Sequence, residues 1–554
     1  MTDNNETIQD NMDHNAALLA RLEEVVGRRH VRTSLPDRWA YTRDCWPKGI
    51  ILTRGRRWWV HEPAGIIQPG SETEVAEVVR ILGEACEPVV PYGAGSGVCG
   101  GTTPDRGGFV VDVKRLRGIT ALDSEALTVR VGAGTIGMDL ETELQRRGFT
   151  LGHYPSSLYC SSVGGYLAAR SAGQQSSLFG KIEDMVQSLR LVTGTGELLD
   201  TGPGLGVDAW PGGLDMTQLV VGSEGTLGII TSSTLRIHPA PEVQLYRGFQ
   251  CPTLEEGLQV QRRLMQAGLR PCVMRLYDEF DSLIAGRGDD AAAEPGLPSR
   301  LVSGLREVAL EAVRERADEV GWLKELWPDV TRRVSRAARG LLGRAIGQPL
   351  LLNQLVDALP GGCLLVLGFE GPERETLREA QAGFAIARQH GFDLGPGPGE
   401  HWHANRFNVS YKQSPLFDMG AFVDTMEVST TWSSLTHMYY AVKEAVAPHA
   451  FIMAHFSHAY PEGASIYFTF AGFGSDTEES LARYEAAWQA GQEAVMASGG
   501  SVAHHHGVGL SKAPRIGHDH QGGRVLFEGL KAAFDPQGIM NPGKVWVLEE
   551  GGGA

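Results

Sequence analysis

Three glycine-rich loops, each beside a short β-type run, constrain the fold of this chain more than any other feature. The first loop, Pro91 to Gly101, follows the apolar run Val89-Val90 and precedes a strand that contains Asp112. Glycines at this density allow positive φ angles, so several backbone N–H groups can turn toward one anion such as a pyrophosphate. The loop is not the GxGxxG turn of a Rossmann fold, because an extended strand follows the glycines.

The second and third loops carry small side chains that let a flat ring system approach the backbone closely. The second loop runs from Pro155 to Gly165 and continues through Ala169 to Gly173, combining serines with paired glycines. The third, Val221 to Ile230, is a turn that leads into a strand. Around the loops, β-type runs alternate with helical patterns over residues 66–239, which indicates an α/β or α+β domain.

Composition is that of a soluble globular protein of two or three domains, with 554 residues, 42% hydrophobic and 21% charged. The formal net charge of -16 provides no basic surface for nucleic acid, so we predict no nucleic-acid partner. Met1 to His14 has no signal-peptide pattern, and no apolar run reaches the ~18 residues of a membrane span. Seven widely spaced cysteines without a CxxC pair indicate reduced thiols, and we therefore expect a cytoplasmic protein.

We expect four segments along the chain. A tail and helical lead-in, residues 1–57, precede the glycine-loop domain of residues 58–240. In residues 241–500, two strand–helix repeats predict an antiparallel sheet with helices on one side, a ferredoxin-like cap, and the whole chain is of the α+β class. A helical insertion at residues 301–345 interrupts the cap. Residues 501–554 carry new glycine and histidine motifs and return to the first domain.

The insertion contains an arginine-rich stretch, residues 331–344, that has two interpretations. It is either the solvated face of a helix in the cap or an interfacial helix that touches a membrane surface. Trp322, Trp327 and Leu341-Leu342 lie near the arginines and keep the second interpretation open. That interpretation predicts peripheral contact with a membrane.

Residues Trp58 to Pro239 resemble the FAD-binding half of the family named after p-cresol methylhydroxylase (PCMH) and vanillyl-alcohol oxidase. The resemblance implies a PCMH-type FAD-binding domain of two subdomains. Some relatives attach FAD covalently through a histidine in the first loop, where this chain has Ala94 and Ser96, so we expect non-covalent FAD. The residues implied for FAD are Pro91, Tyr92, Gly93, Ala94, Gly95, Ser96 and Gly97 at the pyrophosphate; Ser156, Ser157, Leu158, Tyr159, Cys160, Ser161, Ser162, Ala169, Arg170, Ser171 and Ala172 at the ribityl chain and isoalloxazine; and Glu224, Gly225, Thr226, Leu227, Gly228, Ile229 and Ile230 in the third loop.

Motifs in the C-terminal half indicate which members of this family the chain resembles most. Ala503 to Leu510 places His504, His505 and His506 before Gly-Val-Gly, and Phe534 to Lys544 adds a second motif. These runs resemble the C-terminal domain of FAD-linked oxidases. The triple histidine is most similar to the alkyldihydroxyacetonephosphate synthases, whereas D-lactate and D-2-hydroxyglutarate dehydrogenases usually show Glu-His-Gly there.

The histidine run suits proton transfer, because the ordinary pKa of imidazole lies near neutrality. In an extended segment the side chains alternate, so His504 and His506 are expected on one face and His505 on the other. One metal ion cannot easily bind all three, and the His-x-Gly-Asp-Gly-Asn companion motif is absent, so we predict no metal site. A purely structural histidine cluster is the alternative.

The synthase resemblance implies further site residues in the second domain. Tyr467 matches the strand that carries the family's catalytic tyrosine, and Arg275 matches an arginine that could bind an anionic substrate bidentately. The alternatives are an ordinary strand aromatic and a structural ion pair. The family's Tyr-x-Arg-Asp stretch reads Tyr-Lys-Gln-Ser here, so Lys412 or Arg406 would have to replace the charge that Gln413 lacks.

Two functions remain open from the sequence. The resemblance implies exchange of the acyl group of an acylated dihydroxyacetone phosphate for a fatty alcohol, with Tyr467 and the histidines moving protons and Arg275 holding the phosphate. Gln413 instead favours an FAD-linked dehydrogenase or oxidase of a D-2-hydroxy acid or alcohol. An inactive flavin-binding protein would have lost the tyrosine and histidines, which are present. The expected partner is a small-molecule or lipid substrate, and a homodimer is common in the family.

Overall fold

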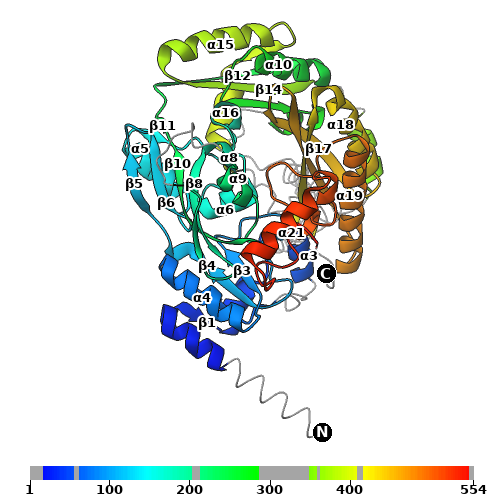
Figure 1. Cartoon of the computed structure of the whole chain (residues 1–554). Coiled ribbons are helices and arrows are strands. Elements are labelled where there is room, and N and C mark those ends of the chain that lie inside the picture. Colours follow the sequence, from blue (N-terminus) through cyan, green and yellow to red (C-terminus); the bar gives the residue numbers. More distant parts are fainter. Residues whose placement is uncertain are drawn as a thin grey trace, which may run out of the picture. The chain divides into compact units, whose positions relative to one another are not determined.

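A computed structural model of the chain describes residues 16–54, 62–202, 213–285, 348–357, 362–408, 416–418 and 420–547. The chain divides into two compact units, one formed by Met1–Ala240 with Val502–Ala554 and the other by Pro241–Ser501. Figure 1 shows their helices and strands, coloured along the sequence. The helical insertion expected at residues 301–345, with its arginine-rich stretch, lies outside the described residues.

The first unit contains two main sheets. A four-stranded sheet has the order β1-β2-β4-β3, in which β2, β4 and β3 are parallel and β1 is antiparallel to β2. A five-stranded antiparallel sheet has the order β5-β6-β10-β8-β9, and β7 pairs with β11. The strands are β1 (Val31–Arg32), β2 (Gly65–Ile67), β3 (Val89–Tyr92), β4 (Phe109–Asp112), β5 (Ile119–Asp123), β6 (Thr128–Gly132), β7 (Phe149–Thr150), β8 (Val186–Thr193), β9 (Leu198–Asp200), β10 (Gly228–Arg236) and β11 (His238–Pro239).

Amphipathic helices cover these sheets. In α4 (Glu72–Glu84), Val75, Val78 and Leu82 recur at helical spacing and are buried in the core of the smaller sheet. The helix begins at Ser71, whose hydroxyl accepts a hydrogen bond from the Glu74 N–H at 3.1 Å. The other helical segments of the first unit are residues 16–26, η1 (Arg28–His30), α2 (Leu35–Ala40), α3 (Pro47–Arg54), η3 (Val113–Arg115), α5 (Gly137–Arg146), α6 (Val163–Ala169), α7 (Ser176–Phe179), α8 (Ile182–Met185), α9 (Met216–Val220), α20 (Gly509–Lys512), η5 (Ile516–His518) and α21 (Gly523–Phe534).

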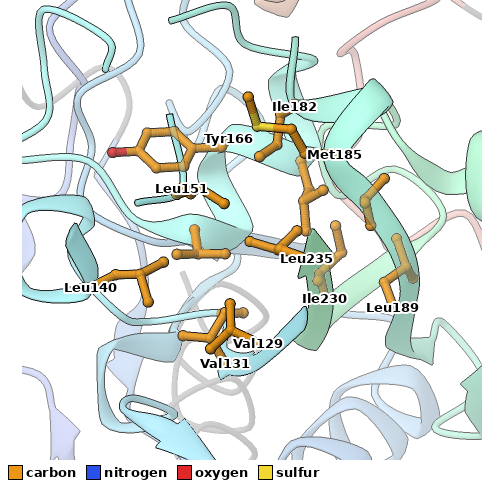
Figure 2. Packing of buried hydrophobic residues seen from close by; sticks show 14 of the residues in the cluster. Val129, Val131, Leu140, Leu151, Tyr166, Ile182, Met185, Leu189, Ile230 and Leu235 are labelled. Atoms are coloured by element: carbon orange, nitrogen blue, oxygen red, sulfur yellow. The ribbon is translucent and has the colours of Figure 1, made fainter. Parts of the chain in front are cut away.

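The larger sheet packs on α5, α6 and α8 through an apolar core. Figure 2 shows Val129, Val131 and Leu235 from the strands meeting Leu140 of α5 and Tyr166 of α6. Burial of apolar surface stabilises such a core by roughly 25 cal/mol per Å². The core therefore fixes the strand and helix ends from which the second and third glycine loops extend.

The second unit is built on one seven-stranded antiparallel sheet in the order β15-β12-β14-β13-β17-β18-β16. Its strands are β12 (Val243–Cys251), β13 (Val273–Tyr277), β14 (Cys363–Gly371), β15 (Phe392–Gly395), β16 (Phe422–Thr431), β17 (Phe451–Ala459) and β18 (Gly463–Gly472). Its helices are α10 (Leu254–Gln266), α11 (Glu279–Ala285), α14 (Pro349–Asp357), α15 (Glu373–Ala387), α16 (Gly397–Asn405), α18 (Trp432–Val446) and α19 (Thr477–Ala497). The order of β12 to β15 is that of a ferredoxin-like fold, and β16 to β18 extend the sheet. The predicted α+β cap is confirmed.

Helices α10, α15, α18 and α19 cover one face of this sheet. Fully buried Phe456 and Phe468 of the central strands contact Tyr439 of α18, and Phe470 contacts Trp488 of α19. Since side chains alternate along a strand, the neighbouring residues of β17 and β18 point to the opposite face. Among the described helices, none is both long and apolar enough to cross a bilayer.

Candidate active site

The first glycine loop begins where β3 ends, and at Gly93 and Gly95 it has no space for a side chain. A Cβ on Gly93 would lie 2.1 Å from Ser162 Oγ, and a Cβ on Gly95 would lie 1.9 Å from Tyr92 Oη. Gly95 also has a φ of +67°, a left-handed conformation that glycine adopts without strain. The glycines therefore allow a turn that other residues could not form.

Backbone donors of this loop are available to an anion. Within the described part of the chain, the N–H groups of Ala94, Gly95, Ser96 and Gly97 donate to no protein acceptor. Nearby, Lys114 Nζ lies 3.1 Å from the Gly93 carbonyl oxygen, and its charge is paired with the Asp112 carboxylate at 2.8 Å. Consecutive free N–H groups in a tight turn form an anion-binding concavity, and this donor set fits the pyrophosphate of FAD.

The second loop is fixed by its own hydroxyl groups. Ser161 Oγ donates to the Ser157 carbonyl at 2.6 Å and contacts the Tyr166 hydroxyl at 2.9 Å. Ser162 is the N-cap of α6, where its hydroxyl accepts from the Gly165 N–H at 3.3 Å. Tyr159 and Cys160 are left exposed at the loop surface.

A buried histidine that the sequence analysis missed supports the segment after α6. His153 Nε2 lies 2.8 Å from Ser171 Oγ, and its ring lies 4.6 Å from that of Tyr166. Burial lowers the pKa of His153 to about 3, so the ring is neutral at physiological pH. Arg170 ends α6 with a φ of +51°, and its guanidinium pairs with Glu183 at 3.4 Å. The Gly-His-Tyr-Pro run before the loop was the available signal.

Glu224 joins the third loop to the C-terminal segment. Its carboxylate accepts hydrogen bonds from the N–H groups of Val508 and Gly509, the latter at 2.9 Å. Asn541 Nδ2 donates to the carbonyl oxygens of Gly101 and Glu224. Glu224 itself has a φ of +48°, which is uncommon for a residue with a side chain. Burial raises the pKa of Glu224 to about 7, although the two backbone N–H bonds act in the opposite direction.

Two further buried charges, also missed by the sequence analysis, lie beside the first loop. Asp44 precedes Cys45, whose N–H donates to the Gly97 carbonyl at 2.9 Å. Lys544 is 1% exposed and donates to the Thr103 carbonyl at 2.7 Å. Burial raises the pKa of Asp44 to about 6 and lowers that of Lys544 to about 8. One acidic and one basic titratable side chain therefore lie beside the first glycine loop.

The three C-terminal histidines cluster, and the prediction of alternating faces is wrong. His504 Nδ1 lies 2.9 Å from His505 Nδ1, and the rings of His505 and His506 are 4.5 Å apart in a T-shaped arrangement. The reason is that residues 504–506 form a bend and not an extended strand. The Nδ1 pair needs one protonated and one unprotonated nitrogen, as a proton donor and acceptor do. In the residues that the structure covers, no group of three or more His, Cys, Asp or Glu could hold a metal ion.

In the second unit, Arg275 and Tyr467 lie on the sheet face opposite helices α10, α15, α18 and α19. The register pairs Tyr277 with His455, His455 with Tyr467, and Tyr467 with Glu427, which forms one row across four strands. The ring of His455 stacks on Tyr467 at 4.6 Å, and Arg275 Nη2 lies 2.7 Å from His455 Nε2. Burial raises the pKa of Tyr467 to about 12, so its phenol stays protonated at neutral pH.

Arg275 has no carboxylate partner among the residues described. Its contacts are with His455 and with Tyr277, whose ring centre lies 5.3 Å from the guanidinium carbon. Its Nε is buried and makes no hydrogen bond within the same part of the chain. A partly buried guanidinium without a counter-charge favours an anionic ligand, which argues against the alternative of a structural ion pair.

Of the other predicted substrate residues, the structure describes only Arg406. Arg406 lies at the end of α16, where its guanidinium donates to the His403 carbonyl and its carbon lies 4.6 Å from the ring centre of Phe407. Lys412 and Gln413 lie outside the described residues. Arg275 and Tyr467 thus lie in the second unit, while His504 to His506 and the glycine loops belong to the first unit.

Comparisons with known proteins match the chain to two family models that meet near residue 240. Residues 63–202 match the family described as FAD binding domain, and residues 240–545 match FAD linked oxidases, C-terminal domain. An alkyldihydroxyacetonephosphate synthase of Dictyostelium discoideum is 28% identical over 87% of this chain and 73% of its own length. The FAD-linked oxidoreductase YgcU of Escherichia coli K12 is 27% identical over 88% and 90%. A solved structure of an alkyldihydroxyacetonephosphate synthase has a TM-score of 0.71 at 24% identity, covering 96% of this chain and 85% of its own.

Proposed function

We propose a specific reaction for this chain, which belongs to the family of FAD linked oxidases and is an FAD-dependent enzyme. In that reaction a fatty alcohol replaces the acyl group of an acylated dihydroxyacetone phosphate. The ester C–O bond at the ketone-bearing fragment breaks, the fatty acid leaves, and the alcohol oxygen forms an ether bond to the same carbon. The alcohol's proton balances the released acid, so the exchange has no net redox change.

The observation that carries the proposal is the unneutralised charge of Arg275. The substrate's phosphate would supply the anion that this guanidinium lacks among the described side chains. Tyr467 lies on the same sheet face with a protonated phenol, which suits donation of a proton to a leaving carboxylate. The same geometry is compatible with other anionic substrates, and the synthase relatives favour a phosphate.

The first unit supplies the cofactor residues and a proton acceptor. The first glycine loop would hold the FAD pyrophosphate, and the second and third loops would contact the ribityl chain and ring. When bound, FAD supplies the chemistry that exchange at a carbon beside a ketone requires. Because the contacting Nδ1 atoms of His504 and His505 share one proton, the pair would take up the proton of the incoming alcohol at an Nε2 atom.

The test is a product analysis under anaerobic conditions. Holoenzyme receives an acyl-dihydroxyacetone phosphate and a fatty alcohol with an ¹⁸O-labelled hydroxyl, and products are identified by mass spectrometry. The proposal expects an ether product that retains the label and one free fatty acid for each ether. Absence of exchange, together with lasting bleaching of the flavin band by a hydroxy acid or alcohol, would overturn it.

That second outcome corresponds to the rival function, an FAD-linked dehydrogenase or oxidase of a D-2-hydroxy acid or alcohol. It is favoured by one sequence observation, the uncharged Gln413 where the synthases carry an arginine. The relative YgcU, an FAD-linked oxidoreductase, is as similar in identity as the synthases are. In this function Arg275 would bind the carboxylate, and Tyr467 would stand beside the carbon that is oxidised.

A further inference from the structure

We infer that His455, held by Asp281, is a positioning residue that orients Arg275 toward the anionic group of the substrate and supports the ring of Tyr467. The inference rests on the proposed function, because it assigns Arg275 and Tyr467 to substrate binding and proton transfer. His455 did not stand out in the sequence, yet it lies between these two residues in the second unit.

The direction of the hydrogen bonds defines the state of His455. Arg275 can only donate, so His455 Nε2, at 2.7 Å from Arg275 Nη2, must be the unprotonated acceptor. The hydrogen is then on Nδ1, which faces Asp281 Oδ2 at 3.2 Å. Asp281 therefore selects the tautomer that leaves Nε2 free to accept from Arg275. A carboxylate that orients a histidine in this way acts through the ring without touching the substrate.

Burial makes this arrangement rigid. His455 is 6% exposed and Asp281 is 8% exposed, so water competes weakly for their hydrogen bonds. Asp281 lies in the first turn of α11, the helix that follows β13, so the strand that carries Arg275 is linked to the group that orients its partner. With one Arg275 donor committed to His455, the guanidinium keeps a fixed direction, and its buried Nε–H makes no hydrogen bond within the described residues.

The ring of His455 has a separate effect on Tyr467. The two residues are directly opposite in the register of β17 and β18, and their rings stack with an interplanar angle of 22°. A contact of this kind limits the directions that the phenol can take. His455 thus has a polar role toward Arg275 and a packing role toward Tyr467.

Two substitutions separate the roles. His455→Phe keeps an aromatic ring against Tyr467 but removes the acceptor for Arg275 and the donor to Asp281. His455→Gln keeps an amide oxygen and an amide N–H for these two partners but removes the ring. Asp281→Asn keeps an acceptor for the Nδ1–H of His455, whereas Asp281→Ala removes it. These two variants form a matched pair at a residue outside the row of strand residues.

The experiment measures binding and turnover in the holoenzyme. Calorimetric titration with dihydroxyacetone phosphate, and with uncharged dihydroxyacetone as reference, gives the contribution of the phosphate, and the exchange assay gives kcat. We expect His455→Phe to weaken phosphate binding about tenfold with kcat within about twofold, and Asp281→Ala to do the same. We expect His455→Gln and Asp281→Asn to bind phosphate nearly as tightly as the wild type, with kcat of His455→Gln lowered about threefold to tenfold.

The outcomes distinguish this inference from the proposed function. Unchanged phosphate affinity in both His455→Phe and Asp281→Ala, or equal losses in the Phe and Gln variants, would overturn the positioning role while the wild-type exchange activity stands. A wild-type enzyme that binds D-lactate and not the phosphate would overturn the proposed substrate. In that case, the same differences in affinity between the variants, measured with D-lactate, would still support the positioning role of His455. A wild type that binds neither anion would overturn both. Unfolding temperature and the flavin spectrum confirm that each variant is folded.

Discussion

Gly93→Ala tests whether the first loop binds the FAD pyrophosphate. The added Cβ would lie 2.1 Å from Ser162 Oγ but 3.3 Å from Ser162 Cβ, so one hydroxyl oxygen causes the clash. Either the hydroxyl or the loop must move by about 1 Å to restore van der Waals contact. If the hydroxyl rotates, the Gly165 N–H loses its cap, at a cost of about 1 kcal/mol. If the loop moves, its N–H donors are misaligned.

Movement of the loop determines the expected effect on FAD affinity. A hydrogen bond to a charged group contributes about 1.5–3 kcal/mol, so the loss of one such bond lowers FAD affinity by about tenfold to a hundredfold. Titration of the apoprotein with FAD, followed by quenching of flavin fluorescence, measures this change. Because Ser162 is itself among the residues implied for FAD, Ser162→Ala is the reference variant. Gly93→Ala combined with Ser162→Ala lacks the clashing oxygen and should bind FAD nearly as tightly as Ser162→Ala alone. Wild-type affinity in Gly93→Ala, or a double variant that binds FAD much more weakly than Ser162→Ala, would refute the reasoning.

Substitutions at three other residues test the remaining site. Arg275→Met should raise KM for the anionic substrate at least tenfold, and Arg275→Lys should restore it only partly, because lysine lacks the bidentate fork; steady-state kinetics measure both. Tyr467→Phe should lower kcat at least about a hundredfold and leave FAD affinity unchanged, which the exchange assay and the flavin titration report together. Burial raises the pKa of Glu224 from 4.5 to about 7, so the folded protein retains a proton that the unfolded chain releases, and stability falls as pH rises through this window. Glu224→Gln cannot titrate and should lack this component when urea unfolding is compared at about pH 5 and about pH 8.

The sequence predicted those parts of the fold that depend on local conformation. The glycine loops were recognisable because positive φ at Gly95 and close contacts at Gly93 need glycine wherever the rest of the chain lies. The bond from Glu224 to Gly509, by contrast, joins residues 285 positions apart. No local pattern encodes it, and the bend at His504 to His506 was missed for the same reason, since its shape depends on the residues around it.

The two units explain why only part of the candidate site was predictable. In the first unit, the candidate site residues lie in loops at strand ends, and the glycines of these loops are recognisable in the sequence. In the second unit, the candidate site residues lie within strands. There, a functional residue differs from a core residue only by the sheet face to which its side chain points. A slip of one residue in β18 would replace Tyr467 by Phe468 in the row beside His455, which would remove the proton donor without changing composition. The register of β18 is fixed by its pairing with β16 and β17. Neither of these strands was predicted. In β17 (Phe451–Ala459), Met and Ala residues interrupt the β-type pattern. His455 therefore becomes identifiable only when the register of the sheet is known.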